Sequence, residues 1–146
     1  GAADKKTPTT FNWKIQSDNK SMINTPSTFS IYVAGLVFKW LLQKGGLKSV
    51  EEENIKKADY LYNFIDSSDF YYNDINKNNR SRMNVAFRIK SDELTSKFVK
   101  EAEEDGLYGL KGHRIVGGLR ASIYNAMSLE GVIALVNFMK KFQGNN

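Results

Sequence analysis

The segment from Thr28 to Lys44 places the strongest constraint on how this 146-residue chain can fold. Its spacing predicts a helix whose apolar side chains occupy nearly every side. Thr25 can cap such a helix, Pro26 suits its first position, and Gly45-Gly46 ends it. A helix with few polar positions has to be covered on most sides. We therefore expect a long buried helix that packs against the rest of its domain, another domain or a second subunit.

A mixture of helices and strands is predicted for the rest of the chain. Ser49 and Glu52 form a capping box at the start of one helix. Helices are predicted at Ser49–Asp66, at Asp92–Asp105 and from Ser128 onward. Short strands are predicted at Phe11–Gln16, Phe70–Tyr72, Met83–Lys90, Leu107–Lys111 and Leu119–Tyr124. This order indicates an α/β or α+β fold, with a small mixed sheet and helices packed on one of its faces.

Composition excludes several kinds of site. The chain has no cysteine, which removes disulfides, thiolate metal sites and cysteine nucleophiles together and is compatible with a cytoplasmic protein. One histidine cannot build a multi-histidine zinc site, so we expect no metal site. No signal peptide is visible. The longest apolar run, Phe29–Phe38, contains Ser30 and Gly35 and is too short to span a membrane.

The charge of the chain permits anionic partners. The formal net charge is +5 and the sequence pI is about 9.3. Such a balance is compatible with nucleic acid or with acidic small molecules. The lysines are scattered, however, with no run longer than a pair, which is typical of a solvated surface. We therefore expect small anions as ligands and no nucleic acid.

The stretch Leu110–Asn125 is the candidate binding site. It holds the only histidine, His113, together with Arg114 and Arg120. Glycines lie between and beside these residues, and they allow a backbone or a ligand to come close. An arginine fork can grip a carboxylate or phosphate with two parallel hydrogen bonds. The segment is a candidate anion receptor; the alternative is a histidine satisfied in a turn and two solvated arginines.

Three segments give the chain a resemblance to a known family. They are Ser21–Phe29 (SMINTPSTF), Arg80–Val85 (RSRMNV) and Leu110–Met127 (LKGHRIVGGLRASIYNAM). In this combination the chain resembles the carboxy-terminal part of the phosphoserine aminotransferases, pyridoxal-phosphate-dependent enzymes of fold type I, class V. The resemblance begins at about Pro8 and covers less than half of a typical member. It implies that residues 21–146 are the C-terminal small domain, while polar composition and the short alternation predict that residues 1–20 are a loose segment with a short strand.

The resemblance implies a reaction for the complete protein. Glutamate gives its amino group to the cofactor, and 3-phosphohydroxypyruvate then accepts it and leaves as phosphoserine, a step of serine biosynthesis. Members are homodimers, and their pyridoxal 5′-phosphate is joined to a lysine of the large domain, which we expect to be absent from this chain. Lys44 is no candidate for that lysine, because it follows Asn24-Thr25-Pro26 whereas the family's lysine precedes this motif. We therefore expect this chain by itself to be inactive.

Individual site residues are also implied by the resemblance. Arg120 matches the arginine that holds the substrate α-carboxylate. His113 and Arg114 match the pair that approaches the substrate's phosphate or distal carboxylate. Asn24 and Thr25 match residues that reach the cofactor phosphate of the partner subunit, Thr25 near a helix amino terminus, where amides favour an anion.

Two other functions stay open from the sequence. The chain could be a stand-alone module that binds phosphoserine or glutamate without catalysis. A basic nucleic-acid binder would show salt-sensitive retention of DNA or RNA, but only the net charge supports it.

Overall fold

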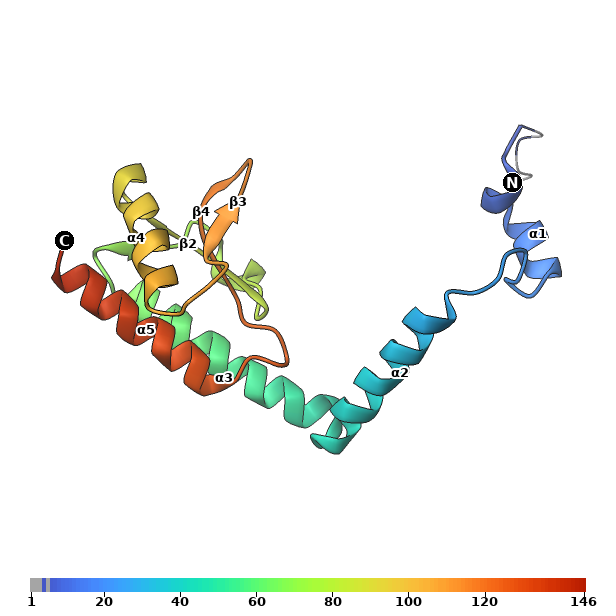
Figure 1. Cartoon of the computed structure of the whole chain (residues 1–146), viewed down its shortest axis with the longest axis horizontal. Coiled ribbons are helices and arrows are strands. Elements are labelled where there is room, and N and C mark those ends of the chain that lie inside the picture. Colours follow the sequence, from blue (N-terminus) through green and yellow to red (C-terminus); the bar gives the residue numbers. More distant parts are fainter. Residues whose placement is uncertain (1–3, 5) are drawn as a thin grey trace. The chain divides into compact units, whose positions relative to one another are not determined.

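The computed structural model describes residue 4 and residues 6–146 of the chain. Part of the segment predicted to be loose, residues 1–3 and 5, lies outside the described residues. The chain divides into two compact units, Gly1–Lys44 and Gly45–Asn146. Figure 1 labels the α-helices of both units and the strands β2, β3 and β4; the two units are described separately below.

The first unit is helical. It contains a short 3-10 helix, η1 (Thr9–Phe11), followed by α1 (Trp13–Asp18) and α2 (Thr28–Gln43). The strand predicted at Phe11–Gln16 is wrong, because α1 occupies this segment. The Asn12 side chain caps α1 by accepting hydrogen bonds from the amides of Lys14 and Ile15 at 3.1 and 3.3 Å. A local cap of this kind stabilises a helix. The segment therefore forms a helix although its apolar residues alternate as in a strand.

The start of α2 also differs from the prediction. Ser27, and not Thr25, occupies the N-cap position, and Pro26 lies before it. The amide of Thr28 donates to the carbonyl of Pro26 at 2.7 Å. With φ −70° and ψ 72°, Ser27 is the centre of an inverse γ-turn. This turn delays the start of the helix until Thr28.

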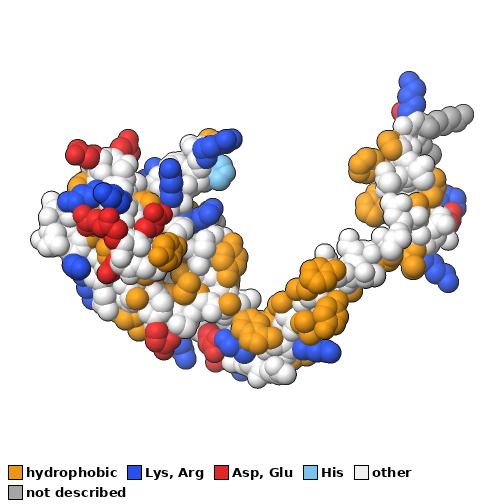
Figure 2. Space-filling view, in the orientation of Figure 1, with side chains coloured by type: hydrophobic (Ala, Val, Ile, Leu, Met, Phe, Trp, Pro, Cys, Tyr) orange, Lys and Arg blue, Asp and Glu red, His pale blue; other side chains and the backbone are white. Residues whose placement is uncertain are grey.

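The apolar surface of α2 is exposed, whereas the sequence predicted a buried helix. Every residue of α2 is described, and none of them is buried. Phe29, Phe38 and Leu42 are 76%, 63% and 73% exposed. Figure 2 shows apolar side chains in orange along this helix. The described residues of the first unit therefore leave the apolar surface of α2 uncovered.

We expect the isolated chain to self-associate through α2, because an apolar surface of this extent promotes association in water. Light scattering at increasing concentration should show a rising average mass. A double variant, Ile31→Lys with Phe38→Lys, should shift the mass towards the monomer, while Lys39→Gln on the same helix should not. A strictly monomeric wild-type profile at high concentration would contradict the prediction.

The second unit is built on a four-stranded sheet in the order β1-β2-β4-β3. Its strands are β1 (Tyr71–Tyr72), β2 (Asn84–Ile89), β3 (Lys111–His113) and β4 (Gly117–Ser122). All three pairings are antiparallel, so the expectation of a mixed sheet is corrected. The connection through α4 (Asp92–Glu104) does bring β3 back in the direction of β2. No parallel pair forms between them, because β4 lies between these two strands.

Helices cover one face of this sheet, as predicted. Alternate side chains of β2 and β4, among them Val85, Phe87, Leu119 and Ala121, are buried on that face. They pack in one core with residues of α4, of α3 (Gly46–Asp66) and of α5 (Leu129–Gly144). The last two helices lie side by side (Figure 1). The opposite face of the sheet carries the side chains that alternate with these and is left open.

Local boundaries in this unit agree with the sequence in part. Ser128 caps α5 as predicted, and its Oγ accepts from the Gly131 amide. The capping box at Ser49 is not used, because α3 already begins at Gly46, after Gly45 turns the chain at φ 96°. The strand predicted at Leu107–Lys111 begins only at Lys111.

The loop between β1 and β2 is tied to α3 by a bidentate ion pair. Both terminal nitrogens of Arg80 donate to the Asp66 carboxylate at 2.8 Å. Arg80 also stacks on the Tyr62 ring, at 4.8 Å from the ring centroid. The hydrogen bond from Arg80, supported by one from Lys77, holds the pKa of Asp66 below its ordinary value.

This ion pair predicts a loss of stability in acid. Because the folded-state pKa of Asp66 is lowered, its contribution is complete above the unfolded-state pKa and is lost as the pH falls through the folded-state value. Asp66→Asn should therefore lower the free energy of unfolding by about 1 kcal/mol at neutral pH. The difference between variant and wild type should shrink below about pH 4. Urea unfolding at several pH values measures this, and Asp69→Asn, at an exposed neighbouring position, should leave the pH dependence unchanged.

Candidate anion-binding site

The hairpin of β3 and β4 carries His113 and Arg114, and glycines decide its shape. Gly117 and Gly118 have φ of 73° and 66°, in the left-handed region that side chains rarely adopt. A Cβ atom on Gly112 would collide with the carbonyls of both. The three glycines noted in the sequence are thus required by the backbone of the hairpin itself.

The His113 ring is exposed and has a defined hydrogen bond. Its Nδ1 accepts from the amide of Ile115 at 3.2 Å, across the turn. A neutral imidazole with an accepting Nδ1 carries its proton on Nε2. His113 therefore presents an Nε2–H donor.

A groove of about 710 Å³ separates this hairpin from the amino-terminal half of α4. The hairpin wall supplies Lys111, His113 and Arg114, of which Lys111 and His113 alternate along one side of β3. In Figure 2 the pale blue histidine stands next to cationic side chains. On the α4 wall, the hydroxyls of Thr95 and Ser96 donate to carbonyls of their own helix at 2.8 and 3.0 Å. The α4 wall also carries the Asp92 carboxylate. The groove is thus cationic along the hairpin, and its α4 wall is polar with one negative charge.

Arg120 lies on the open face of the sheet, away from this groove. It pairs with Ala86 across β2 and β4, between the buried Leu119 and Ala121. Within the described part of the chain, its guanidinium has no ion-pair or hydrogen-bond partner, and the residue is exposed. A fork left unpaired on a scaffold of two central strands can bind a carboxylate bidentately.

Polar side chains that the sequence did not single out lie farther along the same strands as Arg120. Ser122 Oγ donates to Asn84 Oδ1 at 3.3 Å, and Asn84 Nδ2 donates to the Tyr124 hydroxyl at 2.9 Å. Asn84 and Ser122 are opposite each other, two residues along from the Ala86–Arg120 pair and therefore on the same face. Period-two alternation in both strands was the signal that could have identified them.

Two buried polar residues of α3 fix the segment that follows β4. Lys57 is only 3% exposed, and its Nζ donates to the carbonyls of Ile123, Tyr124 and Met127 at 3.2, 2.8 and 2.9 Å. Asn54 Nδ2 donates to Asn125 Oδ1 at 2.7 Å. These bonds anchor the carboxy-terminal end of the strand that bears Arg120.

Asn24 and Thr25 belong to the first unit and are exposed just before α2. Ser27 offers no side-chain hydrogen bond to the amides of the first turn of α2. A helix amino terminus without a side-chain cap is suited to an anion such as a phosphate. This geometry is compatible with the phosphate of pyridoxal phosphate.

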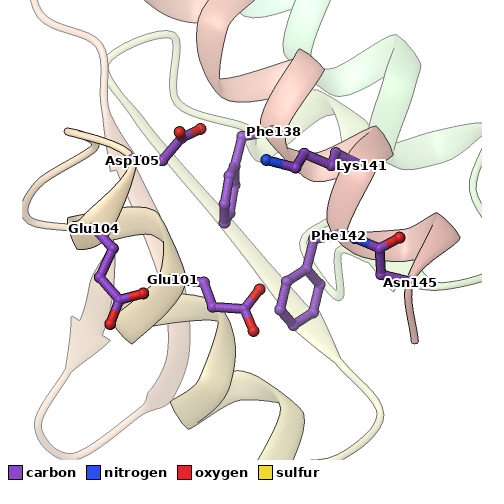
Figure 3. Close-up of a pocket in the computed structure, with 7 residues that line it drawn as sticks. All are labelled: Glu101, Glu104, Asp105, Phe138, Lys141, Phe142 and Asn145. Carbon is purple, nitrogen blue, oxygen red and sulfur yellow. The ribbon is translucent and has the colours of Figure 1, made fainter.

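A second cavity has different chemistry. A cavity of about 330 Å³ between α4 and α5 is shown in Figure 3. Glu101, Glu104 and Asp105 supply carboxylates there, and Lys141 supplies one cation, so the cavity does not suit an anion. Among the described residues, no three His, Cys, Asp or Glu side chains gather as metal ligands. Nor is any helix in the described part of the chain long and apolar enough to cross a membrane.

Comparisons with known proteins identify the same resemblance. The family model described as aminotransferase class-V matches residues 1–135. The phosphoserine aminotransferase of Histophilus somni (strain 129Pt) is 55% identical over 146 residues, which are 100% of this chain and 41% of that relative. The chain thus spans about 40% of the length of the curated relatives it matches.

Solved structures agree. A phosphoserine aminotransferase from Bacillus circulans subsp. alkalophilus matches with a TM-score of 0.90 at 46% identity, over 99% of this chain and 40% of that chain. The PLP-bound phosphoserine aminotransferase from Trichomonas vaginalis matches with a TM-score of 0.86 at 42% identity, over 95% of this chain and 40% of that chain. The resemblance stated from the sequence is confirmed, and the chain belongs to the class-V aminotransferase family, where its similarity is to the phosphoserine aminotransferases.

Proposed function

We propose that this chain is the carboxy-terminal part of a phosphoserine aminotransferase that moves an amino group from glutamate to 3-phosphohydroxypyruvate. The similarity to the Histophilus somni enzyme along the whole chain is the observation that carries the proposal. The exposed cations of the second unit support it, since both substrates carry two or more negative charges. Pyridoxal phosphate, when bound, supplies the electron sink for the transfer.

The residues of this chain bind and orient. Arg120 holds the substrate α-carboxylate with its fork and so fixes the amino-bearing carbon. His113 and Arg114 hold the phosphate or distal carboxylate from the β3–β4 hairpin. Asn24 and Thr25, beside the start of α2, hold the phosphate of the cofactor bound by the partner subunit. The lysine that carries the cofactor belongs to another part of the protein.

We propose the same division of the protein that the sequence predicted. Residues 21–146 form the C-terminal small domain, and the cofactor domain lies in a part of the protein outside this chain. The exposed apolar surface of α2 supports this, because it requires a cover. We further propose that the protein acts as a homodimer in the cytoplasm; the absence of cysteine from these 146 residues is compatible with that compartment.

The test is an amino-transfer assay on the intact protein with glutamate and 3-phosphohydroxypyruvate. We expect formation of phosphoserine and 2-oxoglutarate, with loss of activity after removal of the cofactor. The 146-residue chain alone should show no activity and no cofactor absorbance band. An intact protein without transfer activity would contradict the proposal, as would a borohydride-trapped cofactor on a lysine of this chain. Tight binding of phosphoserine by the chain alone, measured by calorimetry, would favour the stand-alone binding module instead.

A further inference from the structure

Arg88, on β2, connects three parts of the second unit. Its Nε lies 3.0 Å from Asp74 Oδ2, in the loop between β1 and β2. Its Nη2 donates to the carbonyl of Val116, in the turn of the β3–β4 hairpin, at 3.0 Å. A guanidinium can make both contacts at once because its donors point in fixed, divergent directions.

The paired glycines leave room for this side chain. A Cβ atom on Gly118 would lie 3.2 Å from Arg88 Cγ and 3.6 Å from its Nη1. A Cβ atom on the neighbouring Gly117 would lie 4.0 Å from Arg88 Nη1. The stem of Arg88 therefore lies across β4 at the two positions where β4 has no side chains.

The turn itself has little else to hold it. Residues 114–116 are exposed, and Ile115 and Val116 are 82% and 62% exposed. The hydrogen bond from Arg88 is the one that joins these turn residues to a described part of the chain outside the hairpin. The other bond of the turn, from the Ile115 amide to His113, lies within the hairpin.

The far end of the link is fixed as well. The Asn73 side chain donates to the carbonyl of Ala86 on β2 and accepts from the amide of Ile75 at 2.7 Å. Asp74 is thus presented from a loop that is pinned to the sheet. Because this carboxylate is the charge partner of Arg88, the guanidinium acts as a link between segments and not as an open anion receptor of the kind that Arg120 offers.

We propose that Arg88 is a positioning residue, which holds the hairpin turn where His113 and Arg114 meet the phosphate or distal carboxylate of the substrate. This rests on the proposed function. It assigns to Arg88 and the Gly117-Gly118 pair a part in substrate affinity, without contact between Arg88 and the substrate.

The test is Arg88→Gln in the intact protein, with Arg82→Gln as the matched control. Arg82 forms a 2.7 Å ion pair with Glu51 and is similarly exposed, but it lies away from the hairpin. We expect Arg88→Gln to raise KM for 3-phosphohydroxypyruvate about tenfold. This factor corresponds to the loss of one hydrogen bond that involves a charged group, here the bond from Arg88 to the carbonyl of Val116. The value of kcat should stay within about twofold. Asp74→Ala should give a smaller rise in KM, and Arg88→Lys should restore part of the affinity.

Amide hydrogen exchange of the same variants reads the link directly. Arg88→Gln should accelerate exchange in residues 113–117, while Arg82→Gln should leave it unchanged. Unchanged exchange in Arg88→Gln would overturn the link, and faster exchange with an unchanged KM would overturn its role in substrate binding. Both failures leave the proposed function standing if the wild type transfers amino groups. A wild type without that activity would count against the proposed function and, with it, against the role of Arg88 in substrate binding.

Discussion

Replacing Arg120 with leucine is expected to lower kcat/KM for glutamate in the intact protein by about 100-fold or more, because a bidentate charge-assisted bond to the substrate is lost. The residue is exposed on the open face of the sheet, and its guanidinium has no partner among the described residues. Its removal should therefore leave the melting temperature nearly unchanged. Steady-state kinetics and a thermal melt on the same preparation measure both effects.

Two further variants sharpen this test. Arg120→Lys keeps the charge but loses the fork geometry, so it should restore only part of the rate. Arg82→Leu removes an arginine of similar exposure whose partner is Glu51, and it should leave turnover unchanged. Undiminished turnover in Arg120→Leu would show that the carboxylate is held elsewhere, and the proposed assignment of the site would then be wrong.

The elements that the sequence predicted well are those whose pattern comes from burial. The alternation around Leu119 and Ala121 gave β4, and the serine cap at Ser128 gave the start of α5. The segments it predicted badly are decided by a few local hydrogen bonds. The cap from Asn12 made a helix of a predicted strand, and the turn at Ser27 shifted the start of α2.

The sequence indicated which residues belong to the candidate site, but it did not indicate how they are arranged. The resemblance pointed to His113, Arg114 and Arg120 as a group, and their binding roles stay predictions. The structure shows that the first two line a groove against α4, whereas Arg120 lies on the other face of the sheet. The order of residues in the sequence does not show which face of the sheet each one occupies. That depends on the path of the hairpin, which the backbone conformations of Gly112, Gly117 and Gly118 determine.

Lys57 is the residue whose importance the sequence most concealed. It follows Lys56 and looks like one of two solvated lysines. Yet Asn54, Lys57 and Leu61 recur at helical spacing and form one stripe of α3 that is buried throughout. A polar residue on such a stripe was the available signal, since a lysine is buried only where its charge has partners.

Lys57→Met is expected to lower the free energy of unfolding of the second unit by about 3 kcal/mol or more. The carbonyls of Ile123, Tyr124 and Met127 would lose their common donor, and methionine offers none in return. For a unit of this size, the melting temperature should fall by roughly 10–20 °C. Urea unfolding and thermal melts followed by circular dichroism measure the change.

Lys56→Met is the matched control, because it makes the same substitution at the adjacent, exposed position of the same helix. It should change the free energy of unfolding by no more than about 0.5 kcal/mol. Equal stabilities of the two variants would show that water replaces the ammonium group without cost. A large difference would show that one buried charge fixes the segment after β4, and with it the end of the strand that presents Arg120.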